Sequence, residues 1–475
     1  MRILSTLLAL VLAATPLRAA PVPQGLTWSA CAGGMECAAL TVPIDWNRPH
    51  GGQTRVDLAR FPARDPAHKL GSLVVNTGGG ATIQVVRTNP ATVSELTRWF
   101  DVVLIDPRGM GDQGSPAFIE CALAPPGLTG LILHPDERSW QEHASRRAAA
   151  DRSCRQAMGP AYAGLTAWQV AHDLEALRVA LGEPKLRYLG NSYGTVYGQA
   201  YLELFPGKVG RMVLDGVADH TRPSLERWLL DNALTEERQL AHFNDWLPGH
   251  DAIRMFDDLL ARTRRAPLPA GGRTVNEREF LVAVREALAP PRWPALAAAL
   301  RQANDGDASK LAALLPQDPQ PPGYATESLL CHDFMPRVPG YREFRAIESR
   351  LRTAAPRIGR IQGRYQLARC IGLGDDGPAY PPHPLRARGV PPVLISIGDN
   401  DDNTPNLAAE HLAAQLPNAS VIRHGDGHAA YVMQGVAGLG ETCLRGYVHA
   451  YLRTGALPPA QARCPGDLVA RIPRG

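Results

Sequence analysis

The sequence predicts an α/β fold with a mostly parallel, doubly wound sheet and a helical cap inserted before one of its last strands. Two observations in the first half support this. Short apolar runs bounded by turn residues recur there, and helical stretches separate the later runs. Strands that alternate with helices are typical of parallel sheets covered on both faces. The third observation is a long stretch rich in helical patterns and poor in strand signals, after which strand signals return.

The predicted strands of the first half are apolar and are followed by turn residues. A helix is predicted at Ala167–Leu181, where Val170, Leu174 and Leu177 recur at helical spacing. The strands are Leu40–Ile44, Val56–Phe61, Ser72–Asn76, Val102–Asp106, Leu186–Gly190 and Met212–Asp215.

The insertion has Leu-, Ala- and Arg-rich helical patterns broken by proline-rich segments such as 316–322. Strand signals return at Pro392–Ile397 and Ala419–Arg423, so the insertion interrupts the core and is expected to cap an active site. An independent helical domain is the alternative. The expected division is a signal peptide at 1–20, the first part of the core at 21–218, the cap at 219–385 and the C-terminal part of the core at 386–475.

Composition and the N-terminus indicate an exported globular enzyme. The chain of 475 residues is 45% hydrophobic and 20% charged, and its net charge of +4 includes no long basic run, which argues against nucleic acid as a partner. Arg2, the apolar stretch Ile3–Ala14 and the segment Leu17-Arg18-Ala19 are typical of a secretory signal. The apolar stretch is shorter than the ~20 residues that span a bilayer, so we expect no stable membrane anchor. Periplasmic and extracellular locations remain open.

Eight cysteines in an exported chain indicate disulfides, although the count does not fix their connectivity. No CxxC pair occurs, and apart from His332 the cysteines have no neighbouring histidine at zinc-ligand spacing, so neither a metal nor a cofactor is expected. Proximity in the sequence favours the pairs Cys31 with Cys37, Cys121 with Cys154, Cys331 with Cys370, and Cys443 with Cys464.

The segment Gly190-Asn191-Ser192-Tyr193-Gly194 has the pattern of a nucleophile elbow. A bare GxSxG is a weak signal in a chain with 45 glycines. Here, however, a predicted strand precedes the motif and a predicted helix, Thr195–Leu204, follows it. A serine hydroxyl needs an exposed position and a neighbouring base to act as a nucleophile, and such an elbow provides the exposed position. Ser192 is therefore the candidate nucleophile.

Two later loops offer the acid and the base, because this fold orders its triad as serine, acid and histidine. After the strand ending at Ile397, the turn 398–405 carries three aspartates, of which Asp401 is the predicted acid. The glycine-rich loop that ends at His428 then offers the base. His424 is the local rival, but it lies directly at the end of the strand and is more consistent with packing.

The oxyanion of an acyl-transfer reaction needs two backbone N–H donors. One is expected from Tyr193, directly after the nucleophile, and the other from Gly79 in the run Asn76-Thr77-Gly78-Gly79-Gly80. A flexible loop without this role is the alternative. A phosphate-binding loop is disfavoured because the run lacks the spacing and the lysine of a P-loop.

With these residues assigned, the chain resembles the exported tripeptidyl aminopeptidase-like α/β-hydrolases, which are relatives of the proline iminopeptidases. In the family the Asp401 turn corresponds to the acid loop, with an aspartate before a Thr-Pro pair, and Gly427-His428 corresponds to the histidine loop. The segments that carry the resemblance are 37–46, 100–109, 173–178 and 213–217, together with these two loops.

The chain departs from the family at three places. The family's Asn-Pro-Gly-Gly-Pro-Gly loop is replaced by the run 76–81, which lacks both prolines. A tryptophan after the second cap cysteine becomes Leu373, and the Asp-Pro of the acid loop becomes Asp401-Asp402. These changes leave the triad intact but affect the expected specificity.

The resulting hypothesis is a serine hydrolase that works by two-step acyl transfer. The resemblance implies a peptide substrate cleaved near its free N-terminus, and an esterase using the same triad is the alternative. A non-catalytic scaffold is disfavoured because all three triad residues are present. An aminopeptidase must bind an α-ammonium group, for which the cap offers four carboxylates without a basis for choosing among them: Glu226, Glu236, Glu327 and Asp333.

Overall fold

A ten-stranded sheet forms the centre of the protein, as shown by a computed structural model that describes residues 25–111, 115, 117, 119–316, 323–324, 326–335, 337–373 and 380–474. The predicted signal peptide at 1–20 lies outside the described residues. In order across the sheet, the strands are β1 (Ser29–Cys31), β2 (Met35–Pro43), β3 (Gln53–Phe61), β5 (Asp101–Ile105), β4 (Ser72–Asn76), β7 (Leu186–Asn191), β8 (Val209–Asp215), β12 (Val393–Asn400), β13 (Ala419–Gly427) and β14 (Ala462–Cys464).

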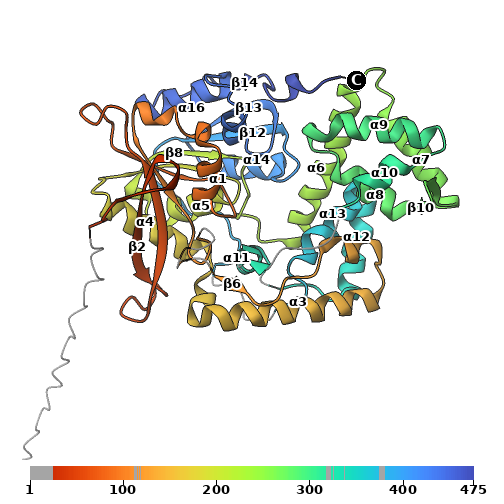
Figure 1. The fold of residues 1–475 in the computed structure, drawn as a ribbon, viewed down its shortest axis with the longest axis horizontal. Helices are drawn as coiled ribbons and strands as arrows, with labels where there is room; N and C mark the ends of the chain where they lie inside the picture. The colour runs from red at the N-terminus through yellow and green to blue at the C-terminus, as the bar shows by residue number, and fades with distance from the viewer. Residues whose placement is uncertain are drawn as a thin grey trace, which may run out of the picture.

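The sheet is antiparallel at its N-terminal edge, where β1, β2, β3 and β5 pair, and parallel from β5 to β14. The predicted α/β class with a mostly parallel sheet is confirmed. Helices cover the sheet on both faces (Figure 1). The α-helices outside the insertion, of which α2 and α3 do not lie on a face of the sheet, are α1 (Thr82–Thr88), α2 (Leu128–Leu133), α3 (Glu137–Met158), α4 (Ala167–Ala180), α5 (Gly194–Leu204), α14 (Asn406–Gln415), α15 (Ala430–Val436) and α16 (Cys443–Thr454).

The chain between β8 and β12 folds mainly as helices that lie to one side of the sheet, on the right in Figure 1. Two short strands, β9 (Leu268–Ala270) and β10 (Arg273–Val275), form a hairpin within it, and β11 (Gly323–Tyr324) pairs with β6 (Glu120–Cys121). The helices are α6 (Leu225–Trp246), α7 (Ala252–Arg265), α8 (Glu277–Glu286), α9 (Trp293–Asn304), α10 (Ser309–Leu314), α11 (Thr326–Phe334), α12 (Tyr341–Ala354) and α13 (Gly359–Ala368).

Helices α2 and α3 precede the insertion in the chain but pack against its helices. Trp140 of α3 stacks on Phe344 of α12, with ring centroids 5.4 Å apart, and Tyr341 Oη donates to the carbonyl of Pro135. In Figure 1 α3 runs beneath α12 and α11. The segment 128–158, which the sequence division assigned to the core, therefore also contacts the helices of the insertion, while its buried residues Leu131, Trp140 and Cys154 share one hydrophobic cluster with the sheet.

One buried ion pair joins three sequence segments that are far apart in the chain. Arg108 donates from Nε and Nη2 to Asp173, at 2.8 and 2.5 Å, and both side chains are buried. The same guanidinium donates to the carbonyls of Pro43 and Ile44, and Trp46 Nε1 donates to Asp173 at 2.8 Å. A buried ion pair is stable only when further hydrogen bonds satisfy it, and this network provides them. It fixes the loop after β5 against α4 and the end of β2.

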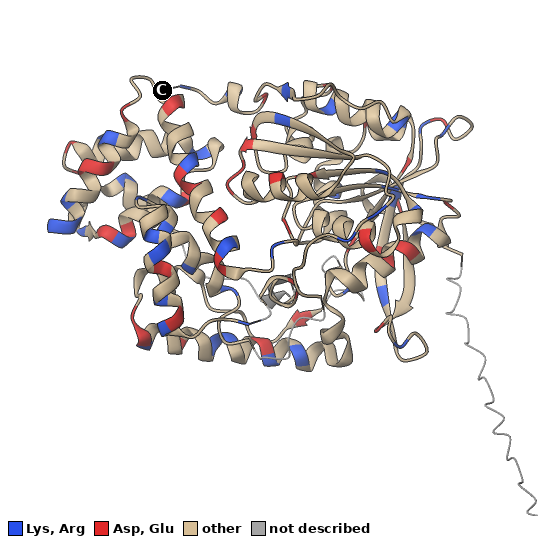
Figure 2. Cartoon of the chain, turned by 180° about the vertical axis from the view of Figure 1, so that it is seen from behind, with Lys and Arg blue, Asp and Glu red and all other residues tan. Residues whose placement is uncertain are grey.

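Four disulfides join the same cysteine pairs that proximity in the sequence favoured. Cys121–Cys154 ties β6 to α3, and Cys331–Cys370 ties α11 to the end of α13. Cys31–Cys37 joins β1 to β2, and Cys443–Cys464 ties α16 to β14. No helix in the described ranges is both long and apolar enough to cross a membrane. Basic and acidic residues are interspersed over the helices of the insertion (Figure 2).

Candidate active site

Ser192 lies at the tight turn between β7 and α5, with a backbone φ of 52° that non-glycine residues rarely adopt. Its backbone N–H donates to the carbonyl of Asp215 at the end of β8, at 3.0 Å. The flanking glycines are required by close packing: a Cβ on Gly190 would lie 2.6 Å from the carbonyl oxygen of Gly194. A Cβ on Gly194 would lie 2.6 Å from Oδ1 of Asn76. The strained turn therefore has the geometry that the elbow motif predicts.

Asp401 and His428 are in direct contact. His428 Nδ1 lies 3.0 Å from both carboxylate oxygens, and the aspartate is buried. The carboxylate also accepts from the backbone N–H groups of Asn403 and Thr404, at 2.9 and 2.7 Å, and from Thr404 Oγ1 at 2.7 Å. These donors hold the carboxylate in one orientation toward the imidazole. The predicted acid and the predicted base thus lie together, although 27 residues separate them.

Electrostatics within this pair favour the charged forms of both groups. Burial raises the pKa of Asp401, but the charge and hydrogen bond of His428 and the donors of Thr404 outweigh it, and the net pKa lies below its usual value. Burial lowers the pKa of His428, whereas the charge and hydrogen bond of Asp401 raise it, and the net shift is upward. An imidazolium formed at His428 is therefore stabilised by its aspartate.

The rival histidine, His424, has a different environment. It is buried, and its Nε2 lies 3.1 Å from Oγ of Ser396 on the neighbouring strand β12. The ring of His428 instead packs at the end of β8, where a Cβ on Gly216 would lie 3.2 Å from its Cε1 and Nδ1. Gly216 follows Asp215, whose backbone carbonyl accepts from the N–H of Ser192. His428 is thus the histidine that the fold brings to the elbow.

The glycine-rich loop after β4 lies beside the elbow. Asn76 fixes its start, because its Nδ2 donates to the carbonyl of Ile105 and its Oδ1 accepts from the N–H of Gly78. Gly78 has a φ of 127°, and a Cβ on it would lie 3.0 Å from Cβ of Ser192. Gly79 is exposed and lines the same cavity as Ser192 and Tyr193. Both proposed N–H donors therefore border the space in front of the serine.

Asp215 is a positioning residue that the sequence reasoning did not single out. Its fully buried carboxylate accepts from Ser396 Oγ at 2.6 Å, from Asn191 Nδ2 at 3.0 Å and from the N–H of Tyr431 at 3.1 Å. Burial raises its pKa. The residue connects the elbow with the helix that follows the histidine loop. Its signal in the sequence was a carboxylate at the end of an apolar strand, the position that also marked Asp401.

A cavity of about 270 Å³ opens over Ser192. Helices of the insertion close it from above, while the elbow and the acid loop form its floor. Its volume lies just below the roughly 300–1,000 Å³ typical of ligand pockets. The lining residues are Gly79, Ser192, Tyr193, Ala218, Asp219, Trp228, Asn232, Leu330, Phe334, Gln366, Arg369, Asn403, Thr404, Pro405 and Ala408.

None of the described cap carboxylates considered for binding an ammonium group lines this cavity. Glu226 forms a solvent-exposed ion pair with Arg350. Glu236 is buried 3.6 Å from Arg285, and burial raises its pKa to about 8. The side chain of Glu327 lies outside the described residues.

Asp333 lies behind the elbow and does not face the substrate space. It is fully buried and accepts from Tyr193 Oη at 2.7 Å and from the N–H of Ala167 at 3.0 Å. Burial raises its pKa to about 8 against the effect of these two donors. It ties α11 of the insertion to the residue that follows the nucleophile.

Two family models match the chain. The model described as alpha/beta hydrolase fold matches residues 71–269, which contain the elbow, and the model described as TAP-like protein matches residues 356–464, which contain Asp401 and His428. The two matched regions together include every residue of the candidate triad.

Curated relatives match over nearly the whole chain. The serine protease Hip1 of Mycobacterium tuberculosis is 29% identical, over 93% of this chain and 91% of its own length. The tripeptidyl aminopeptidase of Streptomyces lividans is 27% identical, over 93% and 86%. A protein of Mycobacterium tuberculosis named carboxylesterase B is also 27% identical, over 90% and 86%.

Proposed function

We propose that this chain, a serine hydrolase that matches the alpha/beta hydrolase fold and TAP-like family models, is an exported aminopeptidase releasing short peptides or single residues from peptide N-termini. The names of two relatives, serine protease and tripeptidyl aminopeptidase, support the peptidase reaction. The four disulfides support export, since disulfides persist in oxidising compartments.

In the proposed mechanism Ser192 attacks the carbonyl carbon of the scissile bond while His428 takes its proton. Asp401 holds the imidazole with its proton on Nδ1 and stabilises the imidazolium. The N–H groups of Tyr193 and Gly79 donate to the oxyanion. His428 returns the proton to the leaving amine, and water then repeats the sequence on the acyl-enzyme to release the N-terminal fragment.

The observation that carries the proposal is the small cavity over Ser192, covered by helices of the insertion. Residues of α6, α11 and α13 line this space and restrict the room for a polypeptide that continues in both directions from the scissile bond. A chain end can enter it. The cavity therefore favours an exopeptidase, and the relative named tripeptidyl aminopeptidase favours the N-terminal end.

Peptide arylamides with free and with acetylated N-termini test this proposal directly. We expect hydrolysis of the free form and at least tenfold lower kcat/KM for the blocked form, because a blocked terminus loses the charge that such an enzyme binds. Equal rates on the two forms would refute the aminopeptidase assignment.

An esterase is the second candidate, favoured by the relative named carboxylesterase B. Acyl esters of 4-nitrophenol, assayed beside the arylamides, distinguish the two, since turnover of esters alone would establish this alternative. Labelling by a fluorophosphonate probe tests the nucleophile in both cases. Ser192→Ala should abolish labelling, and labelling that persists in this variant would disprove the role of Ser192.

A further inference from the structure

The cavity over Ser192 contains a cation without a protein counter-charge. Arg369 follows the last residue of α13, is half-buried and lines the cavity. Within the described part of the chain it forms no salt bridge, and its buried Nε has no hydrogen-bond partner. The guanidinium lies 5.6 Å from the ring centroid of Tyr365 but has no carboxylate partner in the described ranges, so an anionic ligand in the cavity would stabilise it.

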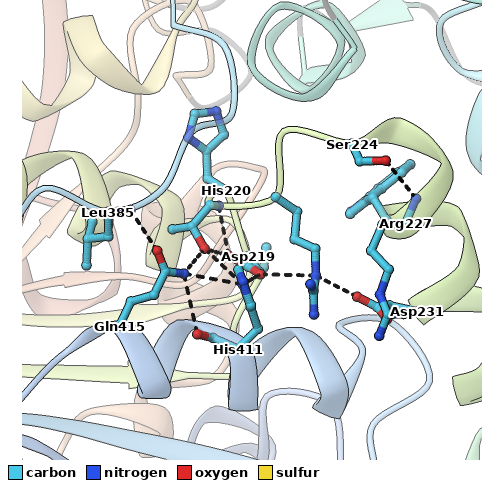
Figure 3. Close-up of polar contacts among 12 residues, drawn as sticks. Asp219, His220, Ser224, Arg227, Asp231, Leu385, His411 and Gln415 are labelled. Atoms are coloured by element: carbon cyan, nitrogen blue, oxygen red, sulfur yellow. Dashed lines mark hydrogen bonds and ion pairs between the residues drawn. The ribbon is translucent and has the colours of Figure 1, made fainter.

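Asp219, the other charged residue among those lining the cavity, does not neutralise this cation, because its carboxylate is already engaged. Its Oδ2 lies 2.7 Å from Nδ1 of His411, and its Oδ1 accepts from the N–H of Thr221 at 2.8 Å. Arg222 approaches within 3.9 Å as well. Figure 3 shows this network, in which Asp219 contacts His411 beside Gln415. Of the two charged residues that line the cavity, Arg369 is therefore the one whose side chain has no charged partner among the described residues.

The guanidinium is attached to a segment that the fold holds firmly. The next residue, Cys370, forms a disulfide with Cys331 of α11. Gln366, three residues before Arg369, donates to Oδ1 of Asn232 on α6 at 3.2 Å and lines the same cavity. A cation fixed on such a support loses little freedom when it binds a ligand, which is what a specificity residue requires.

We propose that Arg369 binds a carboxylate of the substrate and gives the enzyme a preference for an anionic group near the scissile bond. Guanidinium groups bind carboxylates through two parallel hydrogen bonds, which fix orientation as well as affinity. The carboxylate comes either from an acidic side chain on the acyl side or from the C-terminus of a short peptide substrate. The inference rests on the proposed function of Ser192.

The experiment compares kcat/KM for pairs of substrates that differ in one charge. The first pair is Ala-Ala-Glu and Ala-Ala-Gln arylamide, and the second is tetra-alanine and its C-terminal amide. We expect the wild-type enzyme to prefer the anionic member of one pair by about 10- to 100-fold, the usual effect of a hydrogen-bonded charge pair. The pair that shows the preference identifies the source of the carboxylate. If the wild-type enzyme cleaves these peptides and neither pair shows a preference, the proposal is refuted.

Three variants locate the preference. Arg369→Gln should bring the ratio of kcat/KM values to about one by lowering kcat/KM for the anionic substrate, and Arg369→Lys should retain part of the ratio. Arg352→Gln, at an exposed position on α12, is the matched control and should keep the wild-type ratio. A preference that survives in Arg369→Gln would contradict the assignment.

A third pair keeps this test separate from the peptidase proposal. The 4-nitrophenyl esters of butyrate and of glutarate, the latter with a free carboxylate, report on Arg369 even if no peptide is cleaved. A preference for the glutarate ester that is lost in Arg369→Gln, without peptide hydrolysis, would sustain the role of Arg369 and refute the aminopeptidase. Peptide cleavage without any charge preference would sustain the aminopeptidase proposal and refute the role of Arg369.

Discussion

Replacing Asp401 by asparagine should nearly abolish catalysis while leaving the fold intact, and the structure gives the reason. One carboxylate oxygen accepts from the N–H groups of Asn403 and Thr404, so the amide oxygen of an asparagine must take this place. Its NH₂ group would then replace the oxygen that accepts from Thr404 Oγ1 and would face Nδ1 of His428. A donor at that position favours the imidazole with its proton on Nε2, because the other oxygen, also 3.0 Å from Nδ1, already accepts from two backbone N–H groups.

With its proton on Nε2, the histidine cannot accept the proton of Ser192. In the Ser-His-Asp template this exchange of tautomers costs about 10⁴ in kcat, equivalent to roughly 5.5 kcal/mol of transition-state stabilisation. We therefore expect Asp401→Asn to lower kcat by about 10³- to 10⁴-fold, measured on a free tripeptide arylamide, while thermal unfolding shows that the variant is still folded at the assay temperature. Rapid fluorophosphonate labelling should be lost in parallel.

Asp399 provides the matched control because it lies in the same turn but pairs with Arg463, at 2.5 Å. Asp399→Asn should keep its kcat within a few-fold of the wild-type value. Retention of more than a tenth of the wild-type kcat by Asp401→Asn would refute the role of Asp401, and so would an equal loss in the control.

The pH profile supplies an independent measure of the same pair. Asp401 raises the pKa of His428, and the base must be neutral to act. The rate kcat/KM should therefore rise with pH through a pKa above the ordinary histidine value of about 6.5. In Asp401→Asn the residual activity should rise at a lower pH, since the aspartate charge no longer favours the imidazolium. If kcat/KM rises at the same pH in Asp401→Asn as in the wild-type enzyme, a group other than His428 controls the pH dependence.

Three further perturbations test the framework of the site. Asp333 stays protonated in the folded protein up to a pKa of about 8 but ionises near 3.8 when unfolded, so its contribution to stability is lost as pH rises between these values. Asp333→Asn should thus gain in melting temperature relative to wild type from pH 5 to pH 8, and a constant difference would contradict the buried acid. Gly194→Ala would place a Cβ 2.8 Å from the carbonyl oxygen of Asn76. The resulting displacement of the elbow should lower kcat/KM by at least about 100-fold. Gly207→Ala is the control, because its Cβ would meet nothing within 4 Å, and it should leave kcat/KM unchanged. Replacing both Cys331 and Cys370 by serine opens a loop with a sequence separation of 39 and should cost about 3–4 kcal/mol in denaturant unfolding; an unchanged midpoint would show that the loop is held by packing alone.

The local features of the fold were predictable from the sequence because each has a local physical cause. Apolar runs such as Ser72–Asn76 form the strands where they were expected, since burial on both faces of a parallel sheet requires continuous apolar sequence. Asp401 and His428 lie in contact because each follows the end of a parallel strand, and such ends meet at one edge.

Features that depend on distant segments were not accessible in this way. The helices α2 and α3 show no sign in the sequence that they pack on the insertion, because their partners lie about 200 residues later, as between Trp140 and Phe344. Candidate carboxylates such as Glu226 look equivalent in the sequence. The structure separates them by the arginines that tertiary packing brings near, for example Arg350. Arg369 was missed for the same reason, since only the assembled cavity shows that it forms no salt bridge with the described residues around it.

The route from Arg369 to Ser192 shows how the cap and the core act as one site. Arg369 adjoins Cys370, whose disulfide to Cys331 reaches α11, and two residues further along α11 Asp333 accepts from Tyr193 beside the nucleophile. Every link in this path is covalent or a buried hydrogen bond, so the cation and the nucleophile are held at a fixed separation. Without this connection, the distance between Ser192 and the group that binds the substrate carboxylate would vary. Because α11 contacts both, a substrate bound through its carboxylate is held with its carbonyl in register with the serine, and specificity should be expressed in kcat as well as in KM.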